Sequence, residues 1–154
     1  MEIEIRSPLT QTEWEAYYDL RFRVLRAPWN QQKGSERDAK EAEAEHFAVF
    51  KEQQIIAVGR LDQLNESTCQ VRFMAVDPLF QGKNIGKSLM EFILIHSQKK
   101  QEKNVILHAR EMAVPFYERM GFQVTEKSHL LFGEIQHYLM QKKIRLVFTS
   151  LIST

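Results

Sequence analysis

Residues 81–86, Gln-Gly-Lys-Asn-Ile-Gly, separate an apolar run, Val71 to Val76, from a long amphipathic segment, Lys87 to Gln101. This order predicts a strand, a tight turn and a helix. The first N–H groups of a helix have no partner inside it and lie at the positive end of its dipole, so such a turn can bind a pyrophosphate. The segment lacks the three spaced glycines of a dinucleotide site and the Gly-Lys-Ser/Thr end of a P-loop.

The composition limits the classes of protein to consider. A chain of 154 residues is long enough for one domain with its own core, so we expect a single domain over 1–154. With 21 basic and 20 acidic residues the net charge is +1, which argues against a nucleic-acid partner. The single cysteine, Cys69, excludes an internal disulfide framework and a four-cysteine zinc site. We see neither a targeting signal nor a membrane span, and we expect a cytoplasmic protein without a membrane partner.

Hydrophobic patterns predict strands alternating with helices in an irregular order. Thr10-Gln11-Thr12-Glu13 fits a capping box, and apolar residues follow at helical spacing until Pro28. Gly121 stands where a left-handed helix C-cap is expected. The further predicted elements are a strand at 3–5, a short helix at 38–45, strands at 46–50, 55–61, 69–76 and 105–109, a helix at 113–120, and strands at 122–127 and 135–142, with loops at 29–37 and 128–134. This order predicts an α/β fold, a mixed twisted sheet with helices on both faces.

Three segments resemble the GNAT superfamily of N-acetyltransferases. Arg72 to Pro78 followed by Gln81 to Gly86 resembles its strand and Arg/Gln-x-x-Gly-x-Gly/Ala pyrophosphate loop. The segment 107–122, with Phe116-Tyr117-Glu118-Arg119-Met120-Gly121-Phe122, is similar to its strand and Phe-Tyr-x-x-x-Gly-Phe helix. Residues 133–140 resemble a closing strand that ends in His-x-x-Met. The resemblance implies the GNAT-type acyl-CoA N-acyltransferase fold, with acetyl-CoA as cosubstrate and no metal.

One position departs from the pattern. Asn84 stands where the family usually has its middle glycine, and we expect a left-handed or otherwise tight backbone there. Asn is the residue other than glycine that adopts this conformation most readily. We therefore interpret the loop as kept, and cofactor affinity is the property that Asn84 could reduce.

The resemblance also implies which residues bind the cosubstrate. Backbone N–H groups of the loop would hold the pyrophosphate, and the pantetheine arm would pair with the strand, where an N–H near Ala75 or Val76 would polarise the thioester carbonyl. Phe116 is expected to pack against the cofactor. The implied cofactor-binding set is Met74, Ala75, Val76, Gln81, Gly82, Lys83, Asn84, Ile85, Gly86, Lys87, Ser88, Phe116 and Tyr117.

Amide formation from a thioester needs a proton donor for the thiolate and a base for the amine. Tyr117 is the expected donor, because a phenol has a reference pKa of about 10, near that of an alkyl thiol. The alternative is a tyrosine that only packs on the CoA chain. His137 is the first candidate base, with His46 and Glu111 as alternatives, whereas His108 falls in a strand that we expect to be buried.

The acceptor is expected to be a small-molecule or peptide amine, and the first third of the chain would cover it. Three arginines at 21–26 precede an acidic run at 36–45. A solvated helix face is one interpretation. In the other, the acidic run attracts a cationic amine and the arginines anchor a carboxylate or phosphate of the substrate.

Other possibilities stay open. The chain could be a non-catalytic acyl-CoA-binding sensor or interaction module, and an unrelated α/β nucleotide-binding protein is disfavoured by the missing P-loop and dinucleotide patterns. The apolar tail 144–152 could be a last strand or could pair with another subunit as a homodimer.

Overall fold

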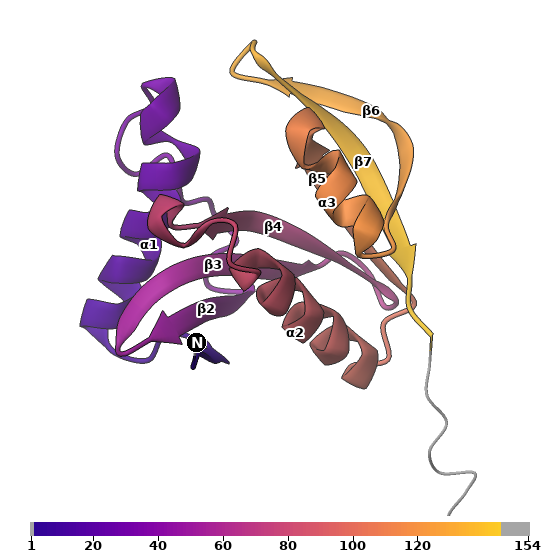
Figure 1. Ribbon diagram of the computed structural model, residues 1–154. Helices are drawn as coiled ribbons and strands as arrows, with labels where there is room; N and C mark the ends of the chain where they lie inside the picture. Colours follow the sequence, from indigo (N-terminus) through magenta and orange to yellow (C-terminus); the bar gives the residue numbers. More distant parts are fainter. Residues whose placement is uncertain (1, 146–154) are drawn as a thin grey trace, which may run out of the picture. The chain divides into compact units, whose positions relative to one another are not determined.

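The computed structural model describes residues 2–145 (Figure 1), and these form two compact units. The first unit comprises residues 2–62 and 71–93, and the second comprises residues 63–70 and 94–145. Within the described range there are seven strands, three α-helices and three short 3-10 helices, which alternate along the chain as predicted. Each unit is described below by itself.

The first unit contains a sheet in the order β1 (Glu4–Arg6), β2 (Glu45–Lys51), β3 (Gln54–Gln63) and β4 (Thr68–Val76). β2 pairs antiparallel with both β1 and β3. The turn between β2 and β3 contains two consecutive residues with positive φ, Glu52 at 49° and Gln53 at 70°, which matches the twist of a hairpin. Eight consecutive residues of β3 are buried, because this strand is covered on both faces.

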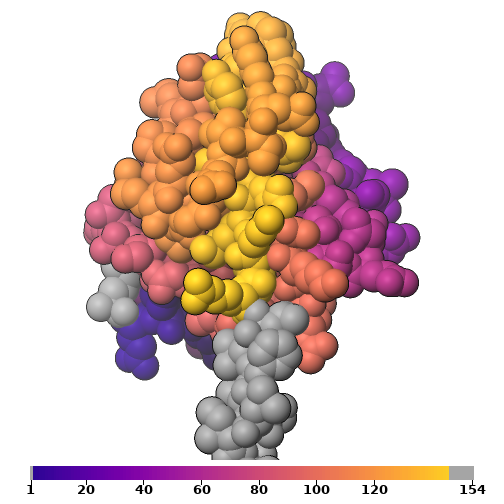
Figure 2. All heavy atoms as spheres, turned by 90° about the vertical axis from the view of Figure 1, so that its right-hand side faces the viewer, coloured from indigo at the N-terminus to yellow at the C-terminus, as the bar shows by residue number. Residues whose placement is uncertain are grey.

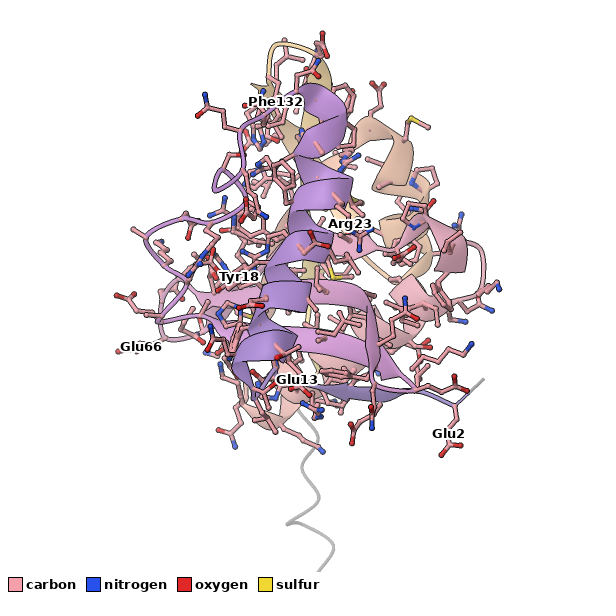
Figure 3. All side chains as sticks on the ribbon, turned by 90° about the vertical axis from the view of Figure 1, so that its left-hand side faces the viewer. Glu2, Glu13, Tyr18, Arg23, Glu66 and Phe132 are labelled. Atoms are coloured by element: carbon pink, nitrogen blue, oxygen red, sulfur yellow. The ribbon has the colours of Figure 1, made fainter. Side chains whose placement is uncertain are left out.

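Helices α1 (Gln11–Leu25) and α2 (Ile85–Lys99) provide that cover. The capping box at the start of α1 is confirmed, since the Glu13 N–H donates to Thr10 Oγ1 at 3.1 Å and the Glu13 carboxylate accepts from the Thr10 N–H. Tyr17 and Leu20 of α1 share a core cluster with Val58 of β3. The first part of α2 packs on the opposite face, where the neighbouring residue, Gly59, faces the side chains of Leu89 and Ile93. Figure 3 looks onto α1, with the strands of the first unit behind it.

The predicted helix at 38–45 is wrong. This segment consists of turns, and strand β2 already begins at Glu45. Asp38 accepts a hydrogen bond from the Lys40 N–H at 2.9 Å, and Glu41 accepts one from the Asp38 N–H at 3.1 Å. These side-chain contacts replace helical hydrogen bonds, because both carboxylates are also held by arginines from other elements.

The second unit contains β7 (Ile135–Lys143) between β5 (Asn104–Arg110) and β6 (Gln123–Leu131), with both pairs antiparallel. Helix α3 (Val114–Arg119) lies between β5 and β6 in the chain, and Gly121 after it has a φ of 94°, as predicted for a left-handed C-cap. Most of β6 is exposed to solvent, and it lies in the orange to yellow surface of Figure 2.

The loop predicted at 128–134 is shorter than expected. β6 extends to Leu131, and only 132–134 turn, with φ of 56° at Phe132 and 69° at Gly133. Among residues 2–145, no helix is both long and apolar enough to cross a bilayer. The predicted tail strand at 144–152 falls almost entirely outside the described residues.

Candidate functional site

The loop 81–86 has the backbone of an anion site. Gly82 has a φ of 77° and Asn84 a φ of 63°, so the predicted left-handed conformation at Asn84 is confirmed. The first helical hydrogen bond of this region runs from the Ser88 N–H to the Asn84 carbonyl at 3.0 Å. No described residue accepts a hydrogen bond from the N–H groups of residues 82–87, and most of these residues are exposed. The free N–H groups at the start of α2 are therefore available to an anionic ligand.

Side chains around the loop fix it and add charge. Ile85 is buried in the first unit and anchors the start of α2. The Gln81 amide donates to the Val76 carbonyl at 3.2 Å, which ties the loop to the end of β4. The ammonium group of Lys83 lies 5.6 Å from the ring centre of Phe80 and stays exposed, so it can add a positive charge to the loop.

The conformation of Asn84 leads to a test with two substitutions. Asn84→Gly keeps the left-handed backbone, so we expect stability within about 1 kcal/mol of the parent and CoA binding at least as tight. Asn84→Val places a β-branched residue in this region and should cost about 1–2 kcal/mol or more while weakening CoA binding. Urea unfolding and calorimetric titration with CoA measure both effects. A valine variant equal to the parent in both measurements would contradict this role.

Strand β4, the expected support of the pantetheine arm, is irregular at one residue. Phe73 has a φ of 55°, which is unusual for a bulky residue inside a strand. The guanidinium carbon of Arg72 lies 5.0 Å from the Phe73 ring centre, so the side chains of these two successive residues lie against each other. Ala75 is buried in the core cluster with Tyr17, so its side chain is not available to a ligand.

An ionic cluster joins α1, β3 and the segment 38–41. Arg60, with a fully buried side chain, donates to both oxygens of Asp62 at 2.7 Å and to both oxygens of Asp38 at 2.7 and 3.0 Å. Arg60 also donates to Glu41 Oε2 at 2.7 Å, and buried Arg21 donates to the same oxygen at 2.9 Å. The Arg60 guanidinium lowers the pKa of Asp38 to about 2. We call these five residues, Arg21, Asp38, Glu41, Arg60 and Asp62, the ionic cluster.

The ionic cluster revises both interpretations of the charges in the first third of the chain. Arg21 and Glu41 do not lie on a solvated helix face, because their side chains are 0% and 9% exposed. Glu41 is not free to attract a substrate amine either, since two arginines already neutralise it. The sequence spacing did not indicate these pairs, because the partners lie 19 to 22 residues apart.

His46 is tied to the same region. Its Nε2 lies 2.7 Å from the Glu41 carbonyl, which can only accept, so Nε2 carries the hydrogen. Its Nδ1 lies 2.9 Å from the Tyr17 hydroxyl, which also lies 3.1 Å from the Gly59 carbonyl and whose one hydrogen these two acceptors share. Burial lowers the pKa of His46, in keeping with the neutral ring. With both nitrogens engaged, His46 is a poor candidate for the base.

A pocket of about 770 Å³ lies between α1 and the segment 33–42 of the first unit. Trp14 and Tyr18 supply its aromatic wall, and Tyr18 points towards this segment in Figure 3. The Arg37 guanidinium lies 4.2 Å from the Tyr18 ring centre. The charged lining residues are Glu15, Asp19, Lys33, Glu36, Arg37, Asp38 and Glu41.

Tyr117 of α3 lies inside the second unit, with its ring 5.0 Å from that of Phe116 and 5.9 Å from that of Phe122. Burial raises the pKa of Tyr117 to about 12, and the positive charge of Arg110 opposes this shift. No described residue forms a hydrogen bond with the Tyr117 hydroxyl. The phenol is therefore protonated at neutral pH and free to donate to a ligand. Glu111, an alternative base, begins the 3-10 helix Glu111–Ala113 and is exposed.

Three imidazoles gather on the sheet of the second unit. His137 is 7% exposed, and its ring stacks on that of His129 at 4.4 Å, while His129 lies 5.2 Å from His108. His108 is half-buried and its Nδ1 lies 3.0 Å from Ser128 Oγ. The sequence reasoning missed His129, because β6 was expected to end before it. The described residues contain no group of three His, Cys, Asp or Glu side chains placed to bind a metal.

His137 has a defined hydrogen-bond state. Its Nδ1 lies 2.9 Å from the Ile135 carbonyl, so Nδ1 carries the hydrogen and Nε2 has the free lone pair. Burial lowers the pKa of His137, and the charges of His129, Arg110 and His108 act in the same direction. The ring is consequently neutral at pH 7 and can accept a proton at Nε2.

Comparison with known proteins adds the following similarities. Residues 17–144 match a family model described as an acetyltransferase (GNAT) domain. An acyl-CoA N-acyltransferase from Pseudomonas aeruginosa is 21% identical, with a TM-score of 0.77 over 92% of this chain and 98% of that one. The PaiA N-acetyltransferase from Thermoplasma acidophilum, solved with coenzyme A, is 17% identical, with a TM-score of 0.73 over 93% and 99% of the two chains.

A curated relative is more similar over a shorter segment. A glucosamine 6-phosphate N-acetyltransferase from Trypanosoma brucei brucei is 37% identical over 54 residues. This segment covers 35% of the present chain and 37% of the relative, so the chain matches little more than a third of that protein.

Proposed function

Because this chain belongs to the GNAT acetyltransferase family and is therefore an acyltransferase, we propose that it transfers the acetyl group of acetyl-CoA to a primary amine. The GNAT-type α/β fold expected from the sequence is confirmed by the family match and by the similar solved structures. We further propose that residues 1–154 form a single N-acetyltransferase domain.

One observation carries the proposal, namely the free N–H groups of residues 82–87 at the start of α2. A pyrophosphate is an anion of the kind that such a helix start binds. Two left-handed residues, Gly82 and Asn84, turn the chain so that consecutive N–H groups are exposed. Lys83 and Lys87 add positive charge beside them. The PaiA protein, solved with coenzyme A, has the same fold, which supports coenzyme A as the ligand here.

The proposal is tested by thermal unfolding with acetyl-CoA, CoA and ATP. A ligand that binds only the folded state raises the free energy of unfolding by mass action, by about 2.7 kcal/mol at a concentration of 100 Kd, and the midpoint rises with it. We expect an increase with both CoA species and none with ATP. Thiol release with a panel of amines then tests turnover. Binding without turnover on any amine would favour a non-catalytic acyl-CoA-binding module, and no binding of CoA would reject the proposal.

In this reaction Tyr117 would donate a proton to the departing thiolate and His137 would accept one from the amine. Tyr117 suits the first role because its hydroxyl is protonated and has no hydrogen-bond partner among residues 2–145. His137 suits the second because its Nε2 lone pair is free and the ring is neutral. Phe116 would pack against the cosubstrate, and the backbone of Met74 to Val76 would bind its pantetheine arm.

The role of His137 predicts a specific pH dependence. The neutral imidazole is the active form, and its pKa is lowered from 6.5, so kcat/KM should fall as the pH drops through a midpoint below 6.5. His137→Gln should lower kcat/KM by about 10²-fold and remove this acidic limb. Rate profiles from pH 5 to pH 8 measure both effects. A variant that retains the limb would exclude His137 as the base, and His96→Gln, which removes a histidine from the last turn of α2, is the control.

The acceptor is proposed to be a small-molecule or peptide amine. The Trypanosoma relative acts, by its name, on glucosamine 6-phosphate, so this amino sugar belongs in the first panel of acceptors.

A further inference from the structure

Arg110, the last residue of β5, is a half-buried cation without a counter-ion. Its side chain forms no hydrogen bond with any described residue, although its backbone belongs to the β5–β7 ladder, and no described carboxylate lies within 4.0 Å of its side-chain nitrogens. By contrast, both arginines of the ionic cluster have fully buried side chains and are paired with carboxylates. Removing a charge from water without a partner is costly, so an unpaired, half-buried guanidinium calls for an explanation.

The neighbours of Arg110 do not supply the missing charge. Arg110 stands directly opposite His137 in the register of β5 and β7, so the two side chains leave the same face of the sheet. His137 is neutral, and Tyr117 keeps its proton, because burial raises its pKa to about 12 despite the positive charge of Arg110. His108, two residues back along β5, shares this face, and His129 stacks on His137. These groups form a polar face that could become more positive on protonation but cannot neutralise a guanidinium.

A guanidinium in this setting is suited to a planar or tetrahedral anion. Its N–H groups form a rigid fork that matches the oxygens of carboxylate and phosphate groups. Burial lowers the pKa of Arg110, but a guanidinium remains charged in proteins. Its side-chain nitrogens keep some exposure to solvent, because the fully buried polar side-chain atoms without a partner in residues 2–145 are Arg21 Nε and Glu102 Oε2. The unpaired guanidinium is therefore not sealed inside the second unit.

We propose that Arg110 binds an anionic group, a carboxylate or a phosphate, of the amine acceptor, beside the imidazoles of His108 and His137. The inference rests on the proposed function, because it places this group on the amine that receives the acetyl group. The acceptors are then anionic amines, such as amino acids or phosphorylated amines, in preference to polycations. Arg110 is the residue that distinguishes them from their uncharged analogues.

Matched acceptor pairs test the proposal, with glucosamine 6-phosphate against glucosamine, phosphoethanolamine against ethanolamine, and β-alanine against propylamine. We expect a higher kcat/KM for the anionic member of at least one pair. Arg110→Gln should reduce that preference about 10- to 100-fold, the value of one or two hydrogen bonds to a charged group. Arg110→Lys should restore part of it. Arg119→Gln, which removes an exposed arginine of the same unit, should leave the preference unchanged.

Binding measurements separate this inference from the proposed function. Calorimetric titration with phosphoethanolamine and with β-alanine needs no turnover, so binding that Arg110→Gln abolishes would support the subsite even if no acetyl transfer occurred. The proposal is overturned if the parent protein shows no preference within any pair, or if Arg110→Gln lowers all acceptors equally. It is also overturned if the variant loses affinity for CoA instead, because Arg110 would then bind a cosubstrate phosphate. If Arg110→Gln does not fold, the preference for anionic acceptors is measured in the parent and in Arg110→Lys, and these two results decide whether Arg110 binds the anionic group.

Discussion

Tyr117→Phe will lower kcat for acetyl transfer by about 10²- to 10⁴-fold, the usual contribution of a positioned general acid. The substitution removes only the hydroxyl group. This hydroxyl has no hydrogen-bond partner among the described residues, so its loss leaves no group of the protein unsatisfied. The ring contacts with Phe116 and Phe122 remain. We therefore expect the free energy of unfolding and the affinity for CoA to stay close to those of the parent.

Steady-state kinetics and unfolding curves measured together decide the role of Tyr117. Tyr138→Phe is the matched control, because Tyr138 lies in β7 of the same unit and its hydroxyl likewise has no described partner. If kcat falls in Tyr117→Phe but not in Tyr138→Phe, the result supports Tyr117 as the proton donor. An unchanged kcat would leave Tyr117 as a residue that only packs against the cosubstrate.

The largest effect on stability is expected for Arg60→Leu. Arg60 is the only described residue that pairs with all three carboxylates of the ionic cluster, Asp38, Glu41 and Asp62. Removing one partner from a buried ion cluster leaves unpaired charges in a poorly solvated site, which costs about 3–5 kcal/mol. For a chain of this length the unfolding midpoint should fall by roughly 6 to 20 °C. Asp62, at 4% exposure, carries most of this penalty.

Two further measurements test the cause of this effect. Arg72→Leu removes an arginine that contacts Asp38 at 3.3 Å but is 38% exposed, and this control should cost less than about 1 kcal/mol. Unpaired buried carboxylates take up protons at higher pH than paired ones, so the deficit of Arg60→Leu should shrink as the pH falls from 7 towards 4. A loss below 1 kcal/mol at pH 7 would show that the cluster does not stabilise the fold.

Local chemistry explains which elements were predictable. The capping box at Thr10 and Glu13 and the C-cap at Gly121 depend on neighbouring residues, and both are confirmed. The left-handed backbone at Asn84 was also predictable, because few residues other than glycine adopt it. The helix predicted at 38–45 failed because its acidic side chains bind arginines far away in the chain. Charge content alone cannot distinguish such pairs from a solvated face.

The candidate site was predictable to a similar degree. The loop 81–86 and Tyr117 belong to motifs that can be read in the sequence, whereas Arg110 and His129 became notable only through the strand register and through the partners that they have or lack. The left-handed Phe73 had no sequence signal, because aromatic residues are typical of regular strands.

The enclosure of the ionic cluster also affects how the protein responds to salt. Dissolved ions screen exposed pairs such as Arg23 and Asp19, whose side chains are about half accessible, but they screen buried pairs much less. The segment 38–41 is held by ion pairs with two fully buried arginines, Arg21 and Arg60. The wall that it forms beside α1 should therefore keep its shape from dilute buffer to molar salt, while the charges on the outer surface of that helix lose their influence on one another.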